Sequence, residues 1–317
     1  MEKHTEIDAS LHSIVIKTWH FLKDVAMMVR VAHWAKNMFL FIPLFFAGKM
    51  FDFSELGEVF WGFAAFSLTA SSIYILNDIK DIDKDRLHPV KKFRVIASGR
   101  IPINIAWIIL GTCCVSGLLI GSSCGISFLL ILVAYLLLNV CYSFGLKNIS
   151  ILDIMILSAG FVLRIKAGGV IAHIGISQWL MIMVFLLSLF LALGKRRDDL
   201  MVKELSGNEV RKAITGYNLE FLNISLAVVS AVMMMAYLMY TLSPEVIRHM
   251  GTYRLYYTGV FVFAGLLRYL QLIYIHQDTR SPTRVLYKDH FIQTCIVLWV
   301  LSYYCLIYFQ NSSFHLS

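Results

Sequence analysis

The chain has 317 residues, of which 58% are hydrophobic and 15% are charged, and its formal net charge is +8. Soluble domains are about half apolar and about a quarter charged, so this composition excludes an ordinary soluble protein and predicts an all-α integral membrane protein. The positive charge is accounted for by membrane topology and gives no reason to expect a nucleic acid partner.

Nine apolar runs follow one another along the chain, each near the roughly 20 residues that a helix needs to cross a bilayer. They lie near residues 33–50, 58–77, 103–121, 124–143, 151–172, 178–194, 218–241, 255–275 and 291–310. They predict a nine-helix transmembrane domain over residues 31–310, between an N-terminal segment (1–30) that has no signal peptide and a short C-terminal tail (311–317).

The positive charges are distributed unevenly between the predicted loops. Most of the 28 lysines and arginines lie in the N-terminal segment or in alternate loops on its side, and only Lys49, Arg248 and Arg254 fall in loops on the other side. The positive-inside rule therefore predicts a cytoplasmic N-terminus and an external C-terminus, in the cell inner (plasma) membrane.

The segment before the first predicted span, Arg30–Asn37 (RVAHWAKN), mixes basic and aromatic residues. Trp34 suits a membrane interface. Lys36 and Asn37 come one turn further in, placed to reach a cytoplasmic cavity between helices.

The segment from Asn77 to Gly99 (NDIKDIDKDRLHPVKKFRVIASG) is rich in charge. Asp78, Asp81 and Asp85 stand at i, i+3 and i+7, so on one helix they fall within an arc of about 60°. Like charges so close destabilise a helix unless something positive lies among them. Clustered carboxylate oxygens suit Mg²⁺, which takes one or two protein carboxylates plus substrate phosphates. We therefore predict a magnesium site at these three aspartates.

A basic stretch follows the aspartates. His88 precedes Pro89, which ends any helical continuation, and the cations that follow are Lys91, Lys92, Arg94 and Arg100. Cations here can take up the phosphate charge that a metal leaves over. The alternative is a solvated loop of mixed charge, which is the usual fate of such runs. Asp83, which points to the opposite side, fits that description.

Two polar groups flank the fifth predicted span. Tyr142 and Lys147 (in YSFGLK) precede Asp153; alone, Tyr142 would be an interfacial aromatic and Lys147 a topology anchor. Arg164 lies eleven residues past Asp153, roughly 16 Å deeper on a helix. A charge at that depth normally faces a polar cavity or a partner, so Arg164 either grips phosphate or pairs with a carboxylate. Lys166 is about 200° further round the helix, and its role stays open.

Lys195 and Arg196 open the sequence KRRDD at the inner end of the sixth predicted span. They either contact phosphate or a metal together with the following acids, or form a helix-end anchor with salt bridges.

Together these segments resemble the UbiA superfamily of intramembrane prenyltransferases. The NDxxDxxxD pattern at Asn77–Asp85 is its signature, and nine helices are its architecture. The motifs HPxKxxR with ASG, YSFGLK, LDI, GFVLR and LALGKR resemble its decaprenyl-phosphate phosphoribosyltransferase branch, as do WxKN at Trp34–Asn37 and RSPTRVLYKD at 280–289. Val95 departs from a proline expected in an RPIASG turn, and Lys166 from an uncharged residue.

The resemblance implies a UbiA-like bundle with a cytoplasmic-facing cavity and a Mg²⁺-dependent reaction. In it 5-phosphoribose passes from phosphoribosyl pyrophosphate to a polyprenyl phosphate, and pyrophosphate is released. The three aspartates would hold Mg²⁺ on the leaving pyrophosphate, while Lys147 and Arg164 would steer the lipid phosphate. The other residues expected to contact substrate are Lys36, Asn37, Asn77, His88, Lys91, Arg94, Tyr142, Asp153, Lys195 and Arg196.

Two other functions compete with this one. A conventional prenyltransferase of the same superfamily would use the same aspartates to join a polyprenyl pyrophosphate to an aromatic acceptor. A transporter or lipid-handling protein would also cross the membrane repeatedly. Transporters, however, tend to bind their substrates near the bilayer midplane, whereas these acids gather at one membrane face.

Overall fold

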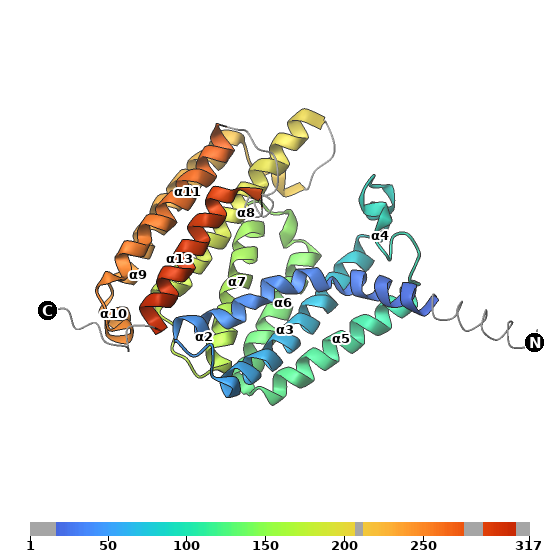
Figure 1. Cartoon of the computed structure of the whole chain (residues 1–317). Coiled ribbons are helices and arrows are strands. Elements are labelled where there is room, and N and C mark those ends of the chain that lie inside the picture. Colours follow the sequence, from blue (N-terminus) through green and yellow to red (C-terminus); the bar gives the residue numbers. More distant parts are fainter. Residues whose placement is uncertain (1–16, 207–211, 276–287, 309–317) are drawn as a thin grey trace, which may run out of the picture. The chain divides into compact units, whose positions relative to one another are not determined.

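The computed structural model describes residues 17–206, 212–275 and 288–308, and the regular elements in these ranges are all helices (Figure 1). The chain divides into two compact units. The first comprises Met1–Leu40 and Gly57–Val140, and the second comprises Phe41–Leu56 and Cys141–Ser317.

The first unit is built on the long helix α3. Its elements in chain order are a helix over Lys17–Val29, η1 (Val31–Phe41), α3 (Phe53–Lys80), α4 (Ile82–Leu87), η2 (Lys91–Phe93), α5 (Ile103–Ser123) and α6 (Ile126–Phe144). Small hydroxyl residues on α3 let its neighbours approach. Ser71 Oγ donates to the carbonyl of Val29 and accepts from Trp34 Nε1, which ties the helix Lys17–Val29 and η1 to the same face of α3.

The second unit is a set of packed helices with a large apolar core. Its elements are α2 (Ile42–Phe46), η3 (Leu146–Asn148), α7 (Leu152–Ile171), α8 (Gln178–Ser206), η4 (Lys212–Gly216), α9 (Leu219–Thr241), α10 (Pro244–Met250), η5 (Arg254–Thr258), α11 (Gly259–Tyr274) and α13 (His290–Tyr308). α8 packs along α7 and α9, and α11 packs along α13. Phe190, Leu222 and Tyr269, from α8, α9 and α11, are among the buried residues of the core.

Seven of the described helices are long and apolar enough to cross a membrane, so the protein is a multi-pass membrane protein. They become eight if the helix pair Lys17–Val29 and Val31–Phe46, which is bent by 49°, forms one span. His290–Leu306 is apolar but shorter. The predicted spans between 103 and 241 agree with helices of the structure, although α8 runs well past the predicted end at 194. The predicted total of nine is not established by these lengths and stays a prediction.

The first predicted span, 33–50, differs in its limits from the helices of the structure. The apolar segment ends at Phe46, and on its N-terminal side it continues across a bend into the helix Lys17–Val29. Arg30, between the two arms, has a φ of 58°, in the left-handed region that non-glycine residues rarely adopt. Hydropathy could not reveal this bend because Lys17–Val29 carries charged residues.

The close approach of α5 to α3 depends on a glycine. A Cβ added to Gly117 would lie 2.5 Å from Thr69 Oγ1 and 3.0 Å from both Ala65 O and Thr69 N. Two of these three atoms are backbone, which cannot turn aside as a side chain can. Gly111, two turns earlier on α5, has nothing within 4 Å of its added Cβ.

We therefore expect Gly117→Ala to destabilise the protein by about 1–3 kcal/mol, the usual cost of overpacking. Gly111→Ala is the matched control, and it should be neutral or slightly stabilising because alanine is the better helix former. Thermal unfolding of both variants in detergent would compare them. Equal melting temperatures for the two would show that α5 does not pack against α3 through Gly117.

Candidate functional site

The three aspartates of the NDxxDxxxD pattern do not lie on one continuous helix, which corrects the arrangement expected from the sequence. α3 ends at Lys80, and Asp81 has φ −94° and ψ 9°, away from helical values, before α4 begins. Asp78 and Asp85 are buried, whereas Asp81 is half-buried and Asp83 is exposed. The repulsion between like charges on one helix gives a physical reason for the turn at Asp81.

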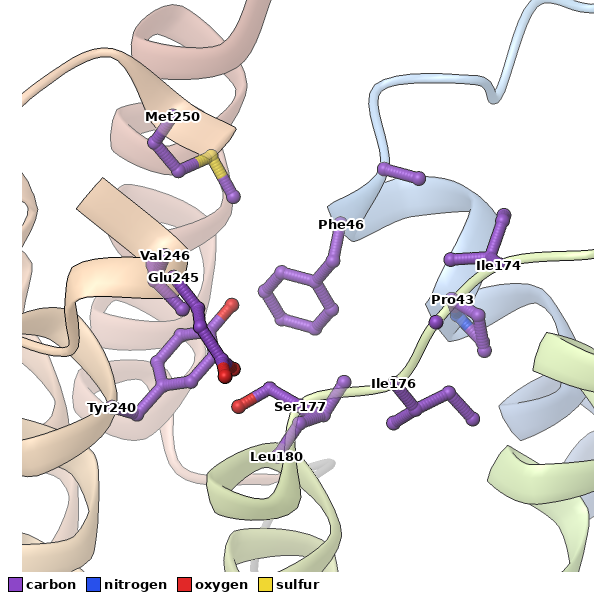
Figure 2. A pocket seen from close by; sticks show the side chains of 12 residues that line it. Pro43, Phe46, Ile174, Ile176, Ser177, Leu180, Tyr240, Glu245, Val246 and Met250 are labelled. Atoms are coloured by element: carbon purple, nitrogen blue, oxygen red, sulfur yellow. The ribbon is translucent and has the colours of Figure 1, made fainter. Parts of the chain in front are cut away.

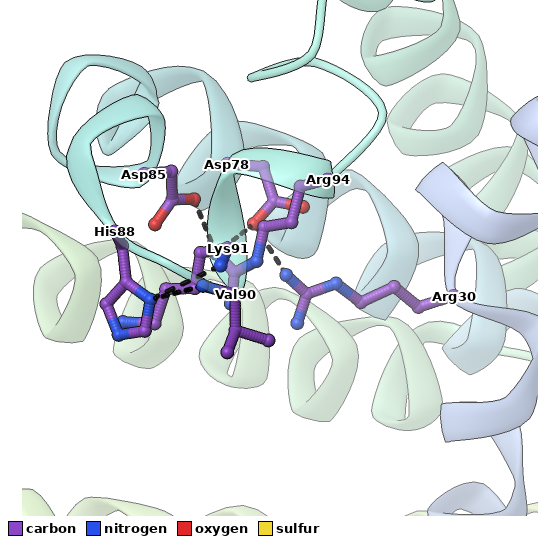
Figure 3. A network of polar contacts seen from close by, with 7 residues as sticks. All are labelled: Arg30, Asp78, Asp85, His88, Val90, Lys91 and Arg94. Atoms are coloured by element: carbon purple, nitrogen blue, oxygen red, sulfur yellow. Dashed lines mark hydrogen bonds and ion pairs between the residues drawn. The ribbon is translucent and has the colours of Figure 1, made fainter.

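Two arginines contact the buried aspartates, and one of them, Arg94, joins the two (Figure 3). Arg94 Nη1 lies 3.0 Å from Asp78 Oδ1 and 2.7 Å from Asp85 Oδ2, so one nitrogen bridges carboxylates of α3 and α4. Arg30 Nη2 lies 2.5 Å from the same Asp78 oxygen. Buried carboxylates require such partners, since burial of an uncompensated charge is very costly.

Arg30 reaches Asp78 because of the bend in the helix pair. Its left-handed backbone turns the chain between the two arms, and its guanidinium lies over the ring of Tyr74, 5.0 Å from the centroid. Tyr74 precedes Asp78 by one turn of α3. Strained backbone conformations often occur at functional sites, so the conformation of Arg30 supports a role for this residue in the site.

The loop that carries Arg94 is shaped by a histidine and a glycine. His88 Nδ1 accepts hydrogen bonds from the backbone nitrogens of Val90 (3.1 Å) and Lys91 (3.3 Å), which fixes the turn into η2. Gly99 has a φ of 76°, a conformation that favours glycine. Val95, which replaces an expected proline, is buried in the core of the first unit.

A cavity of about 400 Å³ opens beside these groups in the first unit. Its lining carries three arginines and a histidine against one carboxylate. The lining residues are Met27, Met28, Arg30, His33, Asp78, Phe93, Arg94, Val95, Ile96 and Arg100. Arg100 donates to the carbonyl of Phe93 (2.8 Å) and pairs with Asp24. The excess of guanidinium groups makes this cavity a candidate phosphate site, because arginine matches phosphate geometry with paired hydrogen bonds.

The donor set around Asp78 suits Mg²⁺ in its chemistry. Asp78 and Asp85 offer hard carboxylate oxygens at one point, and Mg²⁺ usually binds one or two carboxylates together with substrate phosphates. In the part of the chain that the structure describes, no three His, Cys, Asp or Glu side chains form a group that could hold a metal ion. The structure therefore brings two of the three predicted metal ligands together, and the assignment of Asp81 stays a prediction.

The remaining predicted site residues of the first unit differ in their placement. Asn37 is buried and donates to Ser67 Oγ (2.9 Å), so it joins η1 to α3. Lys36 is exposed. Asn77 is half-buried on α3, and its carbonyl accepts from the Asp81 backbone nitrogen (3.0 Å).

A second polar centre lies inside the second unit, around Asp153. Arg196, almost completely buried, donates through Nε to Asp153 Oδ2 (2.5 Å) and through Nη1 to Asp199 Oδ2 (2.8 Å). Tyr217 donates to Asp153 Oδ1 (2.9 Å) and accepts from the backbone nitrogen of Ile151. Burial raises the pKa of Tyr217 to about 12, so its hydroxyl stays protonated and donates at neutral pH.

The burial of this centre favours the helix-end ion-pair alternative that the sequence left open for Arg196. Asp153 and Arg196 were both expected to contact substrate, yet each is buried against the other and together they connect α7 to α8. Tyr217 adds the segment before α9. Ile151, just before α7, has a φ of 71°, and β-branched residues reach this region only when their surroundings hold them there.

The other predicted residues of the second unit lie on its helix ends and on α7. Tyr142 and Lys147 are half-buried, and Lys195 is exposed. Arg164 is buried, donates to the carbonyl of Gly160 (2.9 Å) and lies 5.2 Å from the ring centroid of Phe161. Lys166 is exposed, in keeping with its different position around α7. The motif RSPTRVLYKD lies mostly outside the described residues.

The second unit contains its own cavity of about 330 Å³ (Figure 2). Phe46, Tyr240, Val246 and Met250 contribute to its largely apolar wall. Glu245 is the only charged residue that lines it, so this cavity does not suit phosphate.

The residues predicted from the sequence to form the site do not include Arg30 or Tyr217. Arg30 opens the basic and aromatic segment before the first predicted span, but Lys36 and Asn37 lie nearer the apolar run, and the sequence therefore favours them. Arg100, by contrast, is the last cation of the predicted basic stretch, and it lines the same cavity as Arg94. Tyr217 lies 64 residues from Asp153, and no sequence pattern links the two.

Comparison with known proteins shows the family of this chain. Residues 38–295 match the model of the UbiA prenyltransferase family. A decaprenyl-phosphate phosphoribosyltransferase from Mycolicibacterium smegmatis is 32% identical over 89% of this chain and 92% of its own length. The Corynebacterium glutamicum protein of the same name is 30% identical over 88% of this chain and 84% of its own.

A solved structure shares the fold. The UbiA homologue from Archaeoglobus fulgidus bound to GPP and Mg²⁺ matches with a TM-score of 0.68, at 18% identity, over 90% of this chain and 99% of its own. The protein belongs to the UbiA prenyltransferase family, and it is an enzyme of the transferase class.

Removal of the Asp153 charge should destabilise the second unit. Asp153→Asn leaves Arg196 buried with a weaker partner, and breaking a buried ion pair costs about 3–5 kcal/mol. Asp199→Asn is the matched control, because Asp199 contacts the same arginine but its side chain is 30% exposed, and its effect should be about 1 kcal/mol or less. Chemical or thermal unfolding in detergent measures both variants. A smaller loss for Asp153→Asn than for Asp199→Asn would contradict this role.

Proposed function

We propose that this enzyme transfers 5-phosphoribose from phosphoribosyl pyrophosphate to a polyprenyl phosphate and releases pyrophosphate. The observation that carries the proposal is the arginine-lined cavity beside two buried carboxylates. The names of the relatives at 30–32% identity, which match nearly the whole chain, support the same reaction.

The residues of the cavity suit a donor with phosphate at both ends. Arg30, Arg94 and Arg100 line one space, and a guanidinium binds phosphate oxygens in pairs. Lys91, next to the turn fixed by His88, is a further cation available to the pyrophosphate. Lys147 and Arg164 keep the role suggested by the sequence, which is to contact the lipid phosphate.

The reaction needs no strong base. A phosphate oxygen of the lipid forms a bond to C1 of the ribose while the bond from C1 to the pyrophosphate oxygen breaks, and the electron pair leaves with pyrophosphate. The nucleophile is already an anion, so no proton has to be removed. The task of the protein is to position the two substrates and to stabilise charge with fixed cations.

Asp78 and Asp85 would hold the Mg²⁺ ion, with Asp81 as the third predicted ligand. When bound, this ion supplies Lewis-acid stabilisation of the leaving pyrophosphate and helps to orient it. The structure of the Archaeoglobus fulgidus homologue with GPP and Mg²⁺ supports a divalent metal in the family.

Purified protein with Mg²⁺, a polyprenyl phosphate and phosphoribosyl pyrophosphate labelled in the ribose should place label in the lipid fraction and release pyrophosphate. Excess EDTA should abolish the transfer, and added Mg²⁺ should restore it. The rival reaction is the joining of a polyprenyl pyrophosphate to an aromatic acceptor. Prenylation of an aromatic acid, with no labelled lipid, would replace our proposal by that rival.

The two buried aspartates should matter far more than their exposed neighbour. Asp78→Asn and Asp85→Asn should each lower kcat at least about 100-fold, since even outer partners of a metal site are worth about 10- to 100-fold. Asp83→Asn is the control on the same helix as Asp85. Its side chain is 92% exposed, and the variant should keep near-normal activity. Size-exclusion profiles of the variants would separate lost chemistry from lost folding.

A further inference from the structure

The contact between Arg94 and the two aspartates places a cation where the proposed metal would bind. Arg94 Nη1 lies within 3.0 Å of one oxygen from each carboxylate. Magnesium binds its ligands at about 2.1 Å, so an ion bound between these two oxygens would overlap the position that the guanidinium nitrogen now takes. One of the two cations must give way.

We propose that Arg94 is an exchangeable counter-ion. In the ligand-free enzyme it neutralises Asp78 and Asp85, and it moves to the phosphate oxygens when a metal–pyrophosphate group enters. This inference rests on the proposed function and deepens it. It assigns Arg94 two successive partners and makes tight metal binding depend on the pyrophosphate.

Differences in exposure support this exchange. The side chains of Asp78 and Asp85 are 8% and 4% exposed, whereas that of Arg94 is 31% exposed. The carboxylates therefore belong to the interior, and the arginine reaches them from a more accessible position. Arg94 follows η2 in an extended conformation, with φ −61° and ψ 147°, so no regular helix has to unwind for its side chain to turn.

The cavity to which the Arg94 side chain would move already borders it. Arg94 lines the cavity together with Arg30 and Arg100, and a phosphate bound there would lie among these three positive charges. A rotation of the side chain exchanges one anionic partner for another, so the guanidinium keeps a counter-ion in both states. This matters because an unpaired charge left at a buried site is strongly destabilising.

Arg30 differs from Arg94 and is the fixed partner. Its ion pair is with Asp78, and it is held between the Tyr74 ring and that carboxylate. Its left-handed backbone at the bend also fixes the direction from which it comes. Arg30 therefore orients Asp78 in both states, and it is a positioning residue.

Direct binding of Mn²⁺ to the full-length protein in detergent tests the exchange without any transfer reaction. Electron paramagnetic resonance would measure the affinity for Mn²⁺ alone and then with saturating pyrophosphate. Arg94→Gln removes the competing cation, so we expect it to bind Mn²⁺ alone more tightly, by about 5- to 150-fold, the usual range of coupling between ligands. The same variant should lose affinity for pyrophosphate in the presence of Mn²⁺. These two changes have opposite signs.

Arg100→Gln is the matched control. Arg100 lines the same cavity but contacts Phe93 and Asp24 instead of the buried aspartates. Arg100→Gln removes the same positive charge as Arg94→Gln, but it removes no group that competes with the metal for Asp78 and Asp85. The affinity for Mn²⁺ alone should therefore stay within about twofold of the parent. Arg94→Lys, which keeps the charge, should lie between Arg94→Gln and the parent, and it provides a second reading if Arg94→Gln does not fold.

The exchange is overturned if Arg94→Gln binds Mn²⁺ alone no better than the parent, or does not bind it at all. It is also overturned if Arg94→Gln and Arg100→Gln raise the Mn²⁺ affinity equally, because the effect would then be one of general charge. Failure of the proposed function has another signature, which is absence of labelled lipid while the opposite shifts in Mn²⁺ and pyrophosphate affinity persist.

Discussion

Two carboxylates buried at the end of a membrane helix create the constraint around which the first unit is organised. Asp78 and Asp85 are removed from water, and a buried negative charge requires a positive partner. The protein supplies Arg94 from the loop after α4 and Arg30 from the bend before η1. Three segments that are distant in sequence are thereby held at one point.

The same constraint accounts for the unusual local geometry. The bend at Arg30 brings a guanidinium to Asp78, and the turn at Asp81 ends α3, so that Asp78 and Asp85 lie on different helices and meet at Arg94. His88 and Gly99 shape the loop between them so that Arg94 points inward. The arginines and aspartates of this site are already paired with one another. A phosphate and a divalent ion that bind here therefore have to replace some of these pairs with new ones.

The second unit also buries charged side chains, and there the partners are a carboxylate and a guanidinium from neighbouring helices. Asp153 and Arg196 neutralise each other inside the helix packing, with Tyr217 and Asp199 completing the hydrogen bonds. Both residues carry charges that a sequence analysis readily assigns to substrate. Their mutual burial favours a structural role, which shows that charge and motif position do not separate a binding residue from an internal ion pair.

The sequence by itself determined the class of protein. Long apolar runs require helices in a bilayer, the spacing of Asp78 and Asp85 within NDxxDxxxD marks the family, and the basic stretch that follows them indicates phosphate chemistry. These properties are local or compositional, so they can be read along the chain. Only the tertiary structure decided which charges meet: Arg30 is 48 residues from Asp78, and Tyr217 is 64 residues from Asp153. Pairing over such separations depends on a helix bend and on packing between helices, and neither leaves a pattern in neighbouring residues.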